Sequence, residues 1–256
     1  MPELSERDEF PTTELPCSGY AQSKWVAEKL VQAAHQRGIP TCIHRPGMII
    51  GHSQTGCSNT EDTIGRLVKG LIQLRVAPQL DLPMHLTPVD YVSQAIVHLA
   101  SQPTNWGQAF HLSSPHALSL AELVDHIRSL NYELQDLDYD QWLQTLLALD
   151  ATQDNALKPL APLLSNSTAA YSQYLEVLTL ANVGRQLVLD GLVGTAIDCP
   201  VLDGHLLKRY FDYYSHSGFI TDPELVSSLS LAQLLQLPLT RSTDDLSVNQ
   251  VVAGRN

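Results

Sequence analysis

The chain has 256 residues, of which 44% are hydrophobic and 16% are charged, and its formal net charge at pH 7 is -12. This apolar content predicts a folded chain with a packed core and excludes an intrinsically disordered one. The negative charge repels phosphate backbones and no basic stripe offsets it, so we expect no nucleic-acid partner.

Neither a membrane segment nor a metal site is predicted. The sequence has no uninterrupted apolar run of about 18 residues, and the N-terminus MPELSERDEF lacks the basic and apolar regions of a signal peptide. The four cysteines form no C-x-x-C pair, and the ten histidines form no closely spaced helical pair. We therefore expect a cytoplasmic protein without a bound metal ion.

A helix followed closely by a strand opens the ordered part of the chain. Residues 1–17 are loop-like in composition, and a helix is predicted from Ser18 until Gly38 and Pro40 end it. Its apolar residues fall on one face at helical spacing: Val26, Ala27, Leu30, Val31 and Ala34. The segment PTCIHRPGMIIG then predicts a buried strand and a glycine-containing loop, an order typical of a parallel α/β sheet.

Periodic segments with recognisable starts follow. A helix is predicted over residues 62–74, and the next begins where Thr87 caps, Pro88 takes the first position and Asp90 completes a capping box. The segment QAFHLSS predicts a strand, and Ser119 with Glu122 predicts another capped helix.

The pattern changes after Asn131. A strand is predicted at YELQDLDY, a helix capped by Asp138 and Gln141 comes next, and TAIDCP is read as a short strand. Asp203 caps a final amphipathic helix. Its aromatic residues either line a channel for an acyl chain or, as we favour, belong to the core: Tyr210, Phe211, Tyr213 and Tyr214.

These segments suggest four parts. Residues 1–17 form a leader, residues 18–114 an α/β portion, residues 115–220 a smaller and mostly helical subdomain, and residues 221–256 a partly disordered tail.

Tyr20 and Lys24 are the candidate catalytic residues. A spacing of four places both side chains on one helical face, where the ammonium favours the ionised phenol. Such a phenol can deliver a proton to a carbonyl oxygen as hydride reaches the carbon. In isolation such a pair is more often two surface neighbours, so its context decides its meaning.

The context resembles a known family. The segments GYAQSKWVAEKLV, HRPGMIIGHSQTG and LTPVDYVSQAIVHLA, together with LLKRYFDYYSHSGFI, closely resemble the thioester reductase domains that end nonribosomal peptide and polyketide synthases. These domains are extended short-chain dehydrogenase/reductases, and the reductase domains of carboxylic acid reductases are similar. The resemblance runs from Ser18 to Ile220.

The resemblance implies both a fold and a reaction. The fold would be the second half of a Rossmann-like, doubly wound parallel sheet with a substrate subdomain. NADPH would reduce an acyl or peptidyl thioester, held on a phosphopantetheinylated carrier protein, to an aldehyde or alcohol. Tyr20 would donate the proton and Lys24 would bind the nicotinamide ribose, while Pro46, Gly47 and Met48 would lie against the nicotinamide. The alternative for Arg45-Pro46-Gly47 is an ordinary turn at the end of a strand.

Two parts of the family pattern are missing. Tyr20 is preceded by no apolar strand with the family's relay hydroxyl, so Ser5, Thr12 and Thr13 receive no role. No glycine-rich fingerprint opens a helix after a strand, so we expect the N-terminal cofactor-binding half to be absent and the NADPH site to be incomplete.

Two alternatives to a thioester reductase therefore remain open. One is a non-catalytic fragment that binds a carrier protein or an acyl chain. The other is an extended short-chain dehydrogenase/reductase of the sugar-nucleotide epimerase or dehydratase type. A basic helix face could meet an acidic carrier protein, although a solvated face is the ordinary explanation for its residues: Arg66, Lys69 and Arg75.

Overall fold

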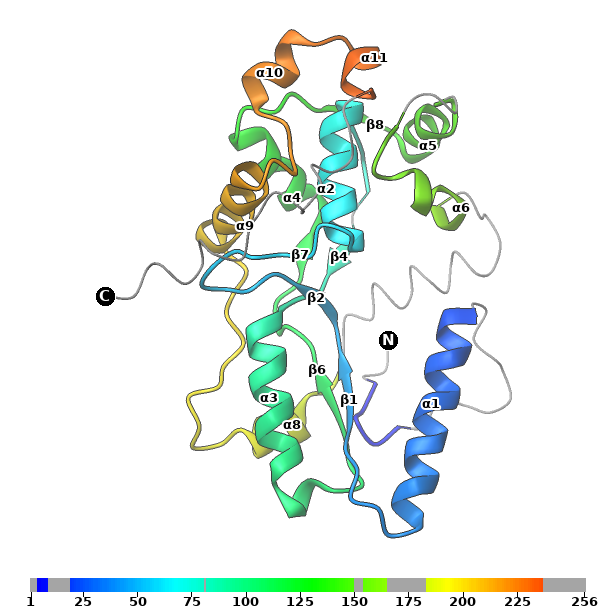
Figure 1. The fold of residues 1–256 in the computed structure, drawn as a ribbon, viewed down its shortest axis with the longest axis vertical. Helices are drawn as coiled ribbons and strands as arrows, with labels where there is room; N and C mark the ends of the chain where they lie inside the picture. Colours follow the sequence, from blue (N-terminus) through cyan, green and yellow to red (C-terminus); the bar gives the residue numbers. More distant parts are fainter. Residues whose placement is uncertain (1–3, 9–18, 81, 150–153, 165–182, 237–256) are drawn as a thin grey trace, which may run out of the picture.

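The computed structural model describes residues 4–8, 19–80, 82–149, 154–164 and 183–236. Figure 1 shows these residues in two bodies, and the passage from β1 to β2 is one of the connections between them. One body contains α1, α3 and α8, and the other contains α2, α4 and α9.

Pairs of parallel strands run through the centre of the molecule. Strand β1 (Ile43–Pro46) pairs with β6 (Ala109–Leu112), and β2 (Met48–Ile50) pairs with β5 (Leu86–Pro88). Only Gly47 separates β1 from β2, and its amide donates a hydrogen bond of 3.1 Å to the carbonyl of Leu112. The expected α/β fold with parallel strands is thus confirmed.

Helices lie on both sides of the β1–β6 pair. Helix α1 (Gly19–Gln36) lies on one side, whereas α3 (Val89–Ser101) and α8 (Gln186–Gly191) lie on the other, with the short helix η1 (Pro103–Asn105) after α3. The apolar core on the α3 side joins residues of α3, β6 and α8: Tyr91, Val92, Ala95, Leu99, Phe110, Leu112 and Val188.

The apolar face of α1 identified in the sequence is only partly covered by the protein. Val26 and Leu30 are 47% and 66% exposed, whereas Val31 and Ala34 of the same face are half-buried. The other half-buried residues of the helix include Trp25, Glu28 and His35. Helical periodicity finds an apolar face but does not identify what covers that face.

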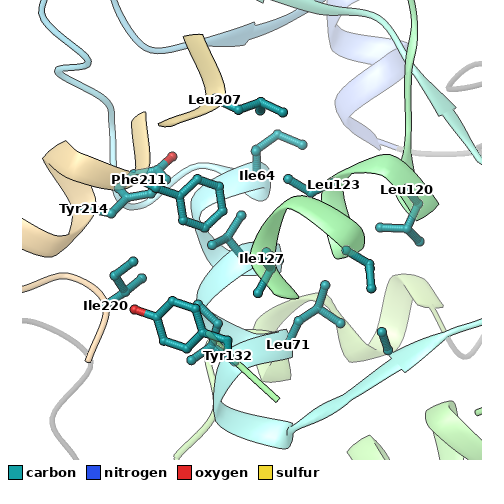
Figure 2. Close-up of a cluster of buried hydrophobic side chains, with 14 of the residues drawn as sticks. Ile64, Leu71, Leu120, Leu123, Ile127, Tyr132, Leu207, Phe211, Tyr214 and Ile220 are labelled. Atoms are coloured by element: carbon teal, nitrogen blue, oxygen red, sulfur yellow. The ribbon is translucent and has the colours of Figure 1, made fainter. Parts of the chain in front are cut away.

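The second body is built around three helices and one large core. Helices α2 (Thr63–Leu74), α4 (Leu120–Ser129) and α9 (Gly204–His216) supply most of its buried side chains. Figure 2 shows aliphatic residues of α2 and α4 packed against the aromatic face of α9. Strands β3 (Val76–Pro78) and β8 (Gln135–Leu137) pair in parallel, and β4 (Pro83–Met84) and β7 (Leu118–Ser119) pair antiparallel.

Short helices complete this body. They are α5 (Tyr139–Leu147), η2 (Lys158–Leu160), α6 (Ala161–Leu164), α10 (Pro223–Ser228) and α11 (Leu231–Leu234). Helices α10 and α11 extend the ordered chain into the expected tail, so α9 is not the last helix. The rest of that tail, residues 237–256, lies outside the described residues.

The two cores do not divide the chain at residue 114, where we placed a boundary. Helix α2 belongs to the larger core with α4 and α9, although it precedes that position. Val188, Leu192 and Cys199 follow it but pack against α3 and β6. Each core therefore contains residues from both sides of position 114.

Most predicted helix starts are confirmed. The carboxylates of Asp62, Asp138 and Asp203 accept amide hydrogen bonds of their helices, and Ser119 with Glu122 forms the expected capping box. The predicted capping of α3 is wrong, because Thr87 lies in β5 and Asp90 binds a neighbouring loop. The strand predicted at TAIDCP is absent, since residues 195–200 have no regular structure.

The described part of the leader is tied into the fold by a buried carboxylate. Leu4 forms a parallel bridge with Val183, and Glu6 is only 5% exposed. The Glu6 carboxylate accepts hydrogen bonds from the amides of His111, Leu187 and Val188, at 3.1, 2.5 and 3.2 Å. Residues 4–8 therefore join β6 to the first turn of α8, so the leader is not simply a loop; residues 1–3 and 9–18 are outside the described part.

Replacing Glu6 should destabilise the protein. In Glu6→Gln one acceptor oxygen becomes a buried donor that faces amide hydrogens, and we expect the free energy of unfolding to fall by about 1–3 kcal/mol. Urea denaturation measures this change. Glu133→Gln, at an exposed position, is the matched control, and equal stabilities for the two variants would contradict the prediction.

Candidate functional site

Tyr20 and Lys24 lie together on the first turns of α1. The Lys24 ammonium nitrogen is 5.5 Å from the centroid of the Tyr20 ring, and the Tyr20 side chain is 75% exposed. Helix α1 runs opposite to β1, so this first turn is directed toward the end of β1 at Pro46 (Figure 1). The structure thus brings the two predicted residues together on an accessible face.

The segment that follows β1 is tightly packed at Gly47. A Cβ at this position would lie 2.9 Å from the carbonyl oxygen of His85 and 3.1 Å from the Thr87 hydroxyl oxygen. Glycine is required here because the protein's own backbone approaches it closely. Pro46 is exposed, whereas Met48 packs against the larger core. A nicotinamide contact at these three residues remains a prediction.

The loop of residues 51–58 leaves the end of β2 and is held by Asp90 at the start of α3. Asp90 accepts hydrogen bonds from the Ser53 amide at 2.9 Å and from the Ser53 hydroxyl at 2.6 Å. His52 lies next to the same carboxylate, with 3.8 Å between its Nδ1 and the Asp90 oxygen. Burial alone would raise the pKa of Asp90, but the hydrogen bonds from Ser53 outweigh it and hold this pKa below its ordinary value.

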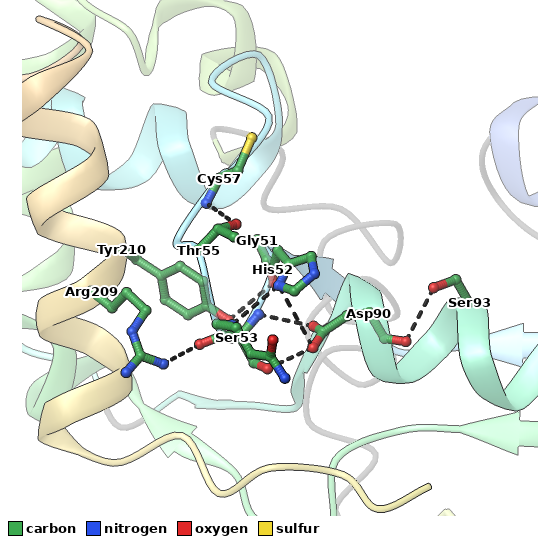
Figure 3. A network of polar contacts seen from close by, with 10 residues as sticks. Gly51, His52, Ser53, Thr55, Cys57, Asp90, Ser93, Arg209 and Tyr210 are labelled. Atoms are coloured by element: carbon green, nitrogen blue, oxygen red, sulfur yellow. Dashed lines mark hydrogen bonds and ion pairs between the residues drawn. The ribbon is translucent and has the colours of Figure 1, made fainter. Parts of the chain in front are cut away.

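Helix α9 holds the same loop from the other side. The Arg209 guanidinium donates to the Ser53 carbonyl, and the Tyr210 hydroxyl donates to the Gly51 carbonyl at 3.0 Å (Figure 3). Gly56, with a φ of +73°, lies directly against the Arg209 backbone. Residues from three separated segments therefore define this loop at the carboxyl end of a parallel strand, where ligands of α/β proteins commonly bind.

This arrangement was missed in the sequence. Asp90 stands two residues after Pro88, a position that indicated a helix cap rather than a partner in a loop. Arg209 is 156 residues from Ser53, and no sequence pattern connects them. The glycines of GHSQTG were the one available signal for a tight loop.

The aromatic residues of α9 belong to the core, as favoured from the sequence. Tyr210, Phe211 and Tyr214 are each about 5% exposed or less, and Tyr213 is half-buried. The cavity beside them has a volume of about 20 Å³, which is far too small for an acyl chain. In this structure they do not form a substrate channel.

The basic residues of α2 and of its C-cap have contacts with other parts of the protein. Arg66 pairs with Glu61, and Arg75 donates to the carbonyls of Val226 and Leu229. Lys69 is 5% exposed and lies 4.8 Å from the centroid of the Phe219 ring, and burial lowers its pKa to about 8. Arg66 is thus part of a surface ion pair, whereas Lys69 and Arg75 do not belong to a solvated basic face.

Tyr20 and Lys24, the two residues expected to face the nicotinamide ribose, are exposed and adjacent. No glycine-rich turn opens a helix within the described ranges, and Gly191 of the GLVG segment instead ends α8.

Neither a metal site nor a membrane-spanning helix is found among the described residues. Their histidine, cysteine and acidic side chains form no group of three that could hold a metal ion. None of the helices in these ranges combines the length and apolar character needed to cross a membrane.

Comparisons with known proteins agree with the motifs. An NAD-binding family described as male sterility protein matches residues 2–96. A component of the linear gramicidin synthase of Brevibacillus parabrevis is 33% identical over 218 residues, which are 84% of this chain and 4% of that protein. The terminal reductase domain of the myxalamid polyketide–nonribosomal peptide pathway is 35% identical, with a TM-score of 0.70.

The chain belongs to the reductase-domain family of nonribosomal peptide and polyketide synthases. The solved reductase domain matches 87% of this chain, whereas the chain covers 56% of that domain. Aldehyde reductase lnaA of Aspergillus flavus is 31% identical over 208 residues, which are 76% of this chain and 20% of that protein. This reductase-domain chain thus spans only part of the length of its relatives.

Replacing Asp90 should loosen the loop of residues 51–58. We expect Asp90→Asn to lower the free energy of unfolding at neutral pH by about 1 kcal/mol. Because the folded-state pKa is lowered, the carboxylate's contribution is present above its ordinary pKa of 3.8 and is lost as the pH falls through the folded value.

Urea denaturation at neutral pH and at about pH 3 measures both effects. The difference between wild type and Asp90→Asn should shrink at the lower pH. Asp212→Asn, which removes the exposed pair with Lys208 on α9, is the control and should change stability little. A difference that grows on acidification would refute the assignment.

Proposed function

We propose that this chain supplies the catalytic helix and the substrate-side subdomain of an NADPH-dependent thioester reductase. The observation that carries the proposal is the adjacent, exposed pair of Tyr20 and Lys24 on α1, directed toward the end of β1. The substrate would be an acyl or peptidyl chain, bound as a thioester to the phosphopantetheine arm of a carrier protein.

The roles of the two residues follow from their chemistry. NADPH, when bound, would supply a hydride to the thioester carbonyl carbon. The Tyr20 hydroxyl would donate its proton to the carbonyl oxygen, after which the carbon–sulfur bond breaks and the pantetheine thiol and an aldehyde are released. Lys24 would hydrogen-bond the ribose hydroxyls, and its positive charge would stabilise the phenolate that Tyr20 becomes. A second reduction of the same kind would yield the alcohol.

One observation favours a second function for the chain by itself. Val26 and Leu30 are exposed on the apolar face of α1, and the chain covers 56% of the solved reductase domain. A chain with this exposed apolar face would bind a carrier protein or an acyl chain without turnover. An epimerase or dehydratase with the same Tyr and Lys is the other alternative, and turnover of a thioester separates it from a reductase.

The first test removes the Tyr20 hydroxyl. In a protein that joins this chain to a cofactor-binding half, we expect Tyr20→Phe to lower thioester reduction by at least about 100-fold, because the proton donor is lost. NADPH oxidation with an acyl-loaded carrier protein measures the rate, and NADPH binding should be preserved. Tyr213→Phe, in the half-buried part of α9, is the control. Retained activity in Tyr20→Phe would remove Tyr20 from the mechanism.

The second test concerns the cofactor. For the 256-residue chain alone we expect no measurable NADPH binding, because the sequence has no glycine-rich turn to hold the pyrophosphate. Titration followed by nicotinamide fluorescence measures the affinity. A micromolar dissociation constant would show that the chain binds the dinucleotide by another route.

A further inference from the structure

Glu28 joins the catalytic helix to the sheet through Arg45. Arg45 Nε donates to one Glu28 oxygen at 3.0 Å, and a terminal guanidinium nitrogen donates to the other oxygen. The two side chains are 16% and 17% exposed, so the pair is largely shielded from water. A guanidinium bound at both carboxylate oxygens fixes the direction of approach as well as the distance.

His111 continues the link from β1 to β6. The remaining terminal nitrogen of Arg45 donates to His111 Nε2 at 3.0 Å, and His111 Nδ1 lies 2.9 Å from the Gly184 carbonyl oxygen. Burial lowers the pKa of His111, so its imidazole is neutral near pH 7. Since Nε2 accepts from Arg45, Nδ1 carries the proton and donates it to Gly184.

The buried end of this chain of contacts is held by the core. His111 is 2% exposed, and its backbone amide donates to Glu6. The polar link thus runs from the surface of α1, across two paired strands, to a residue whose ring and backbone are both bonded.

Apolar burial contributes less to holding α1 than to holding the other long helices of the described structure. Helix α1 buries no residue fully, whereas each of the other described helices of nine or more residues buries at least two. Tyr20, Lys24 and Glu28 are spaced by four, so they follow one row along the helix. Any rotation of α1 that breaks the Glu28 contact also moves the other two side chains.

We propose that Glu28, Arg45 and His111 form a positioning relay that sets the rotation of α1 and thereby the placement of Tyr20 and Lys24. The proposal rests on the proposed function for its catalytic consequence, but the placement itself can be measured without turnover. None of the three is a catalytic residue, because they act through the helix.

Fluorine NMR on fluorotryptophan-labelled protein tests the placement directly. Trp25 lies on α1 next to Lys24, whereas Trp142 is buried in the larger core. We expect Glu28→Gln to shift or broaden the Trp25 resonance and to leave the Trp142 resonance unchanged. The matched control is Glu61→Gln, which breaks the ion pair with Arg66 and should alter neither resonance.

A charge-conserving variant tests whether the forked geometry matters. In Arg45→Lys the charge remains, but a single ammonium does not span Glu28 and His111, so the Trp25 resonance should change as it does in Glu28→Gln. An unchanged Trp25 resonance in both variants would overturn the proposal. A Trp142 resonance that changes along with Trp25 would also overturn it, since the effect would then be general destabilisation.

Kinetics in the joined protein test the catalytic consequence. We expect Glu28→Gln to lower kcat for thioester reduction by about tenfold while KM for the loaded carrier changes less than about twofold, because the proton donor is misplaced and binding is kept. A change in KM alone would overturn this role. If wild type shows no turnover while the Trp25 resonance responds as expected, the proposed function fails and the positioning relay stands.

Discussion

The tight packing of neighbouring atoms around Gly47 is the constraint on which the arrangement of the two bodies depends. Strand β1 pairs with β6 in one body, and one residue later β2 pairs with β5 beneath the other. The carbonyl of His85 and the hydroxyl of Thr87 occupy the space that a Cβ would need. A larger residue would push these strands apart, because protein interiors have no spare volume for it. The same narrow crossing places the first turn of α1 and the loop of residues 51–58 near the ends of consecutive strands.

Polar contacts, rather than apolar burial, define the parts of the structure nearest to the candidate site. The loop of residues 51–58 is held by Asp90 and by two residues of α9, and α1 is held by Glu28 through Arg45. Directional contacts of this kind specify an orientation, which hydrophobic packing alone does much less strictly. The apolar cores lie behind these contacts and support the strands from which they extend.

The exposed apolar face of α1 occurs in a chain that spans only part of the length of its relatives. Val26 and Leu30 have the pattern of core residues but face solvent, while the solved reductase domain is almost twice as long as the part that this chain matches. Exposing apolar side chains to water costs free energy unless another element covers them. The exposure of this face of α1 is therefore observed in a chain that covers only 56% of the solved reductase domain.

The sequence by itself determined the local structure and the family. Periodicity and capping residues located α2, α4, α5 and α9, because these signals act within a few residues of the chain, and a spacing of four placed Tyr20 beside Lys24. Only the tertiary structure decided which face of α1 is covered and that Asp90 binds Ser53 instead of capping its own helix. It also decided that Lys69 and Arg75 are bound inside the protein. These outcomes depend on partners up to about 150 residues away, and the side chain of a charged or apolar residue does not reveal which distant surface will meet it.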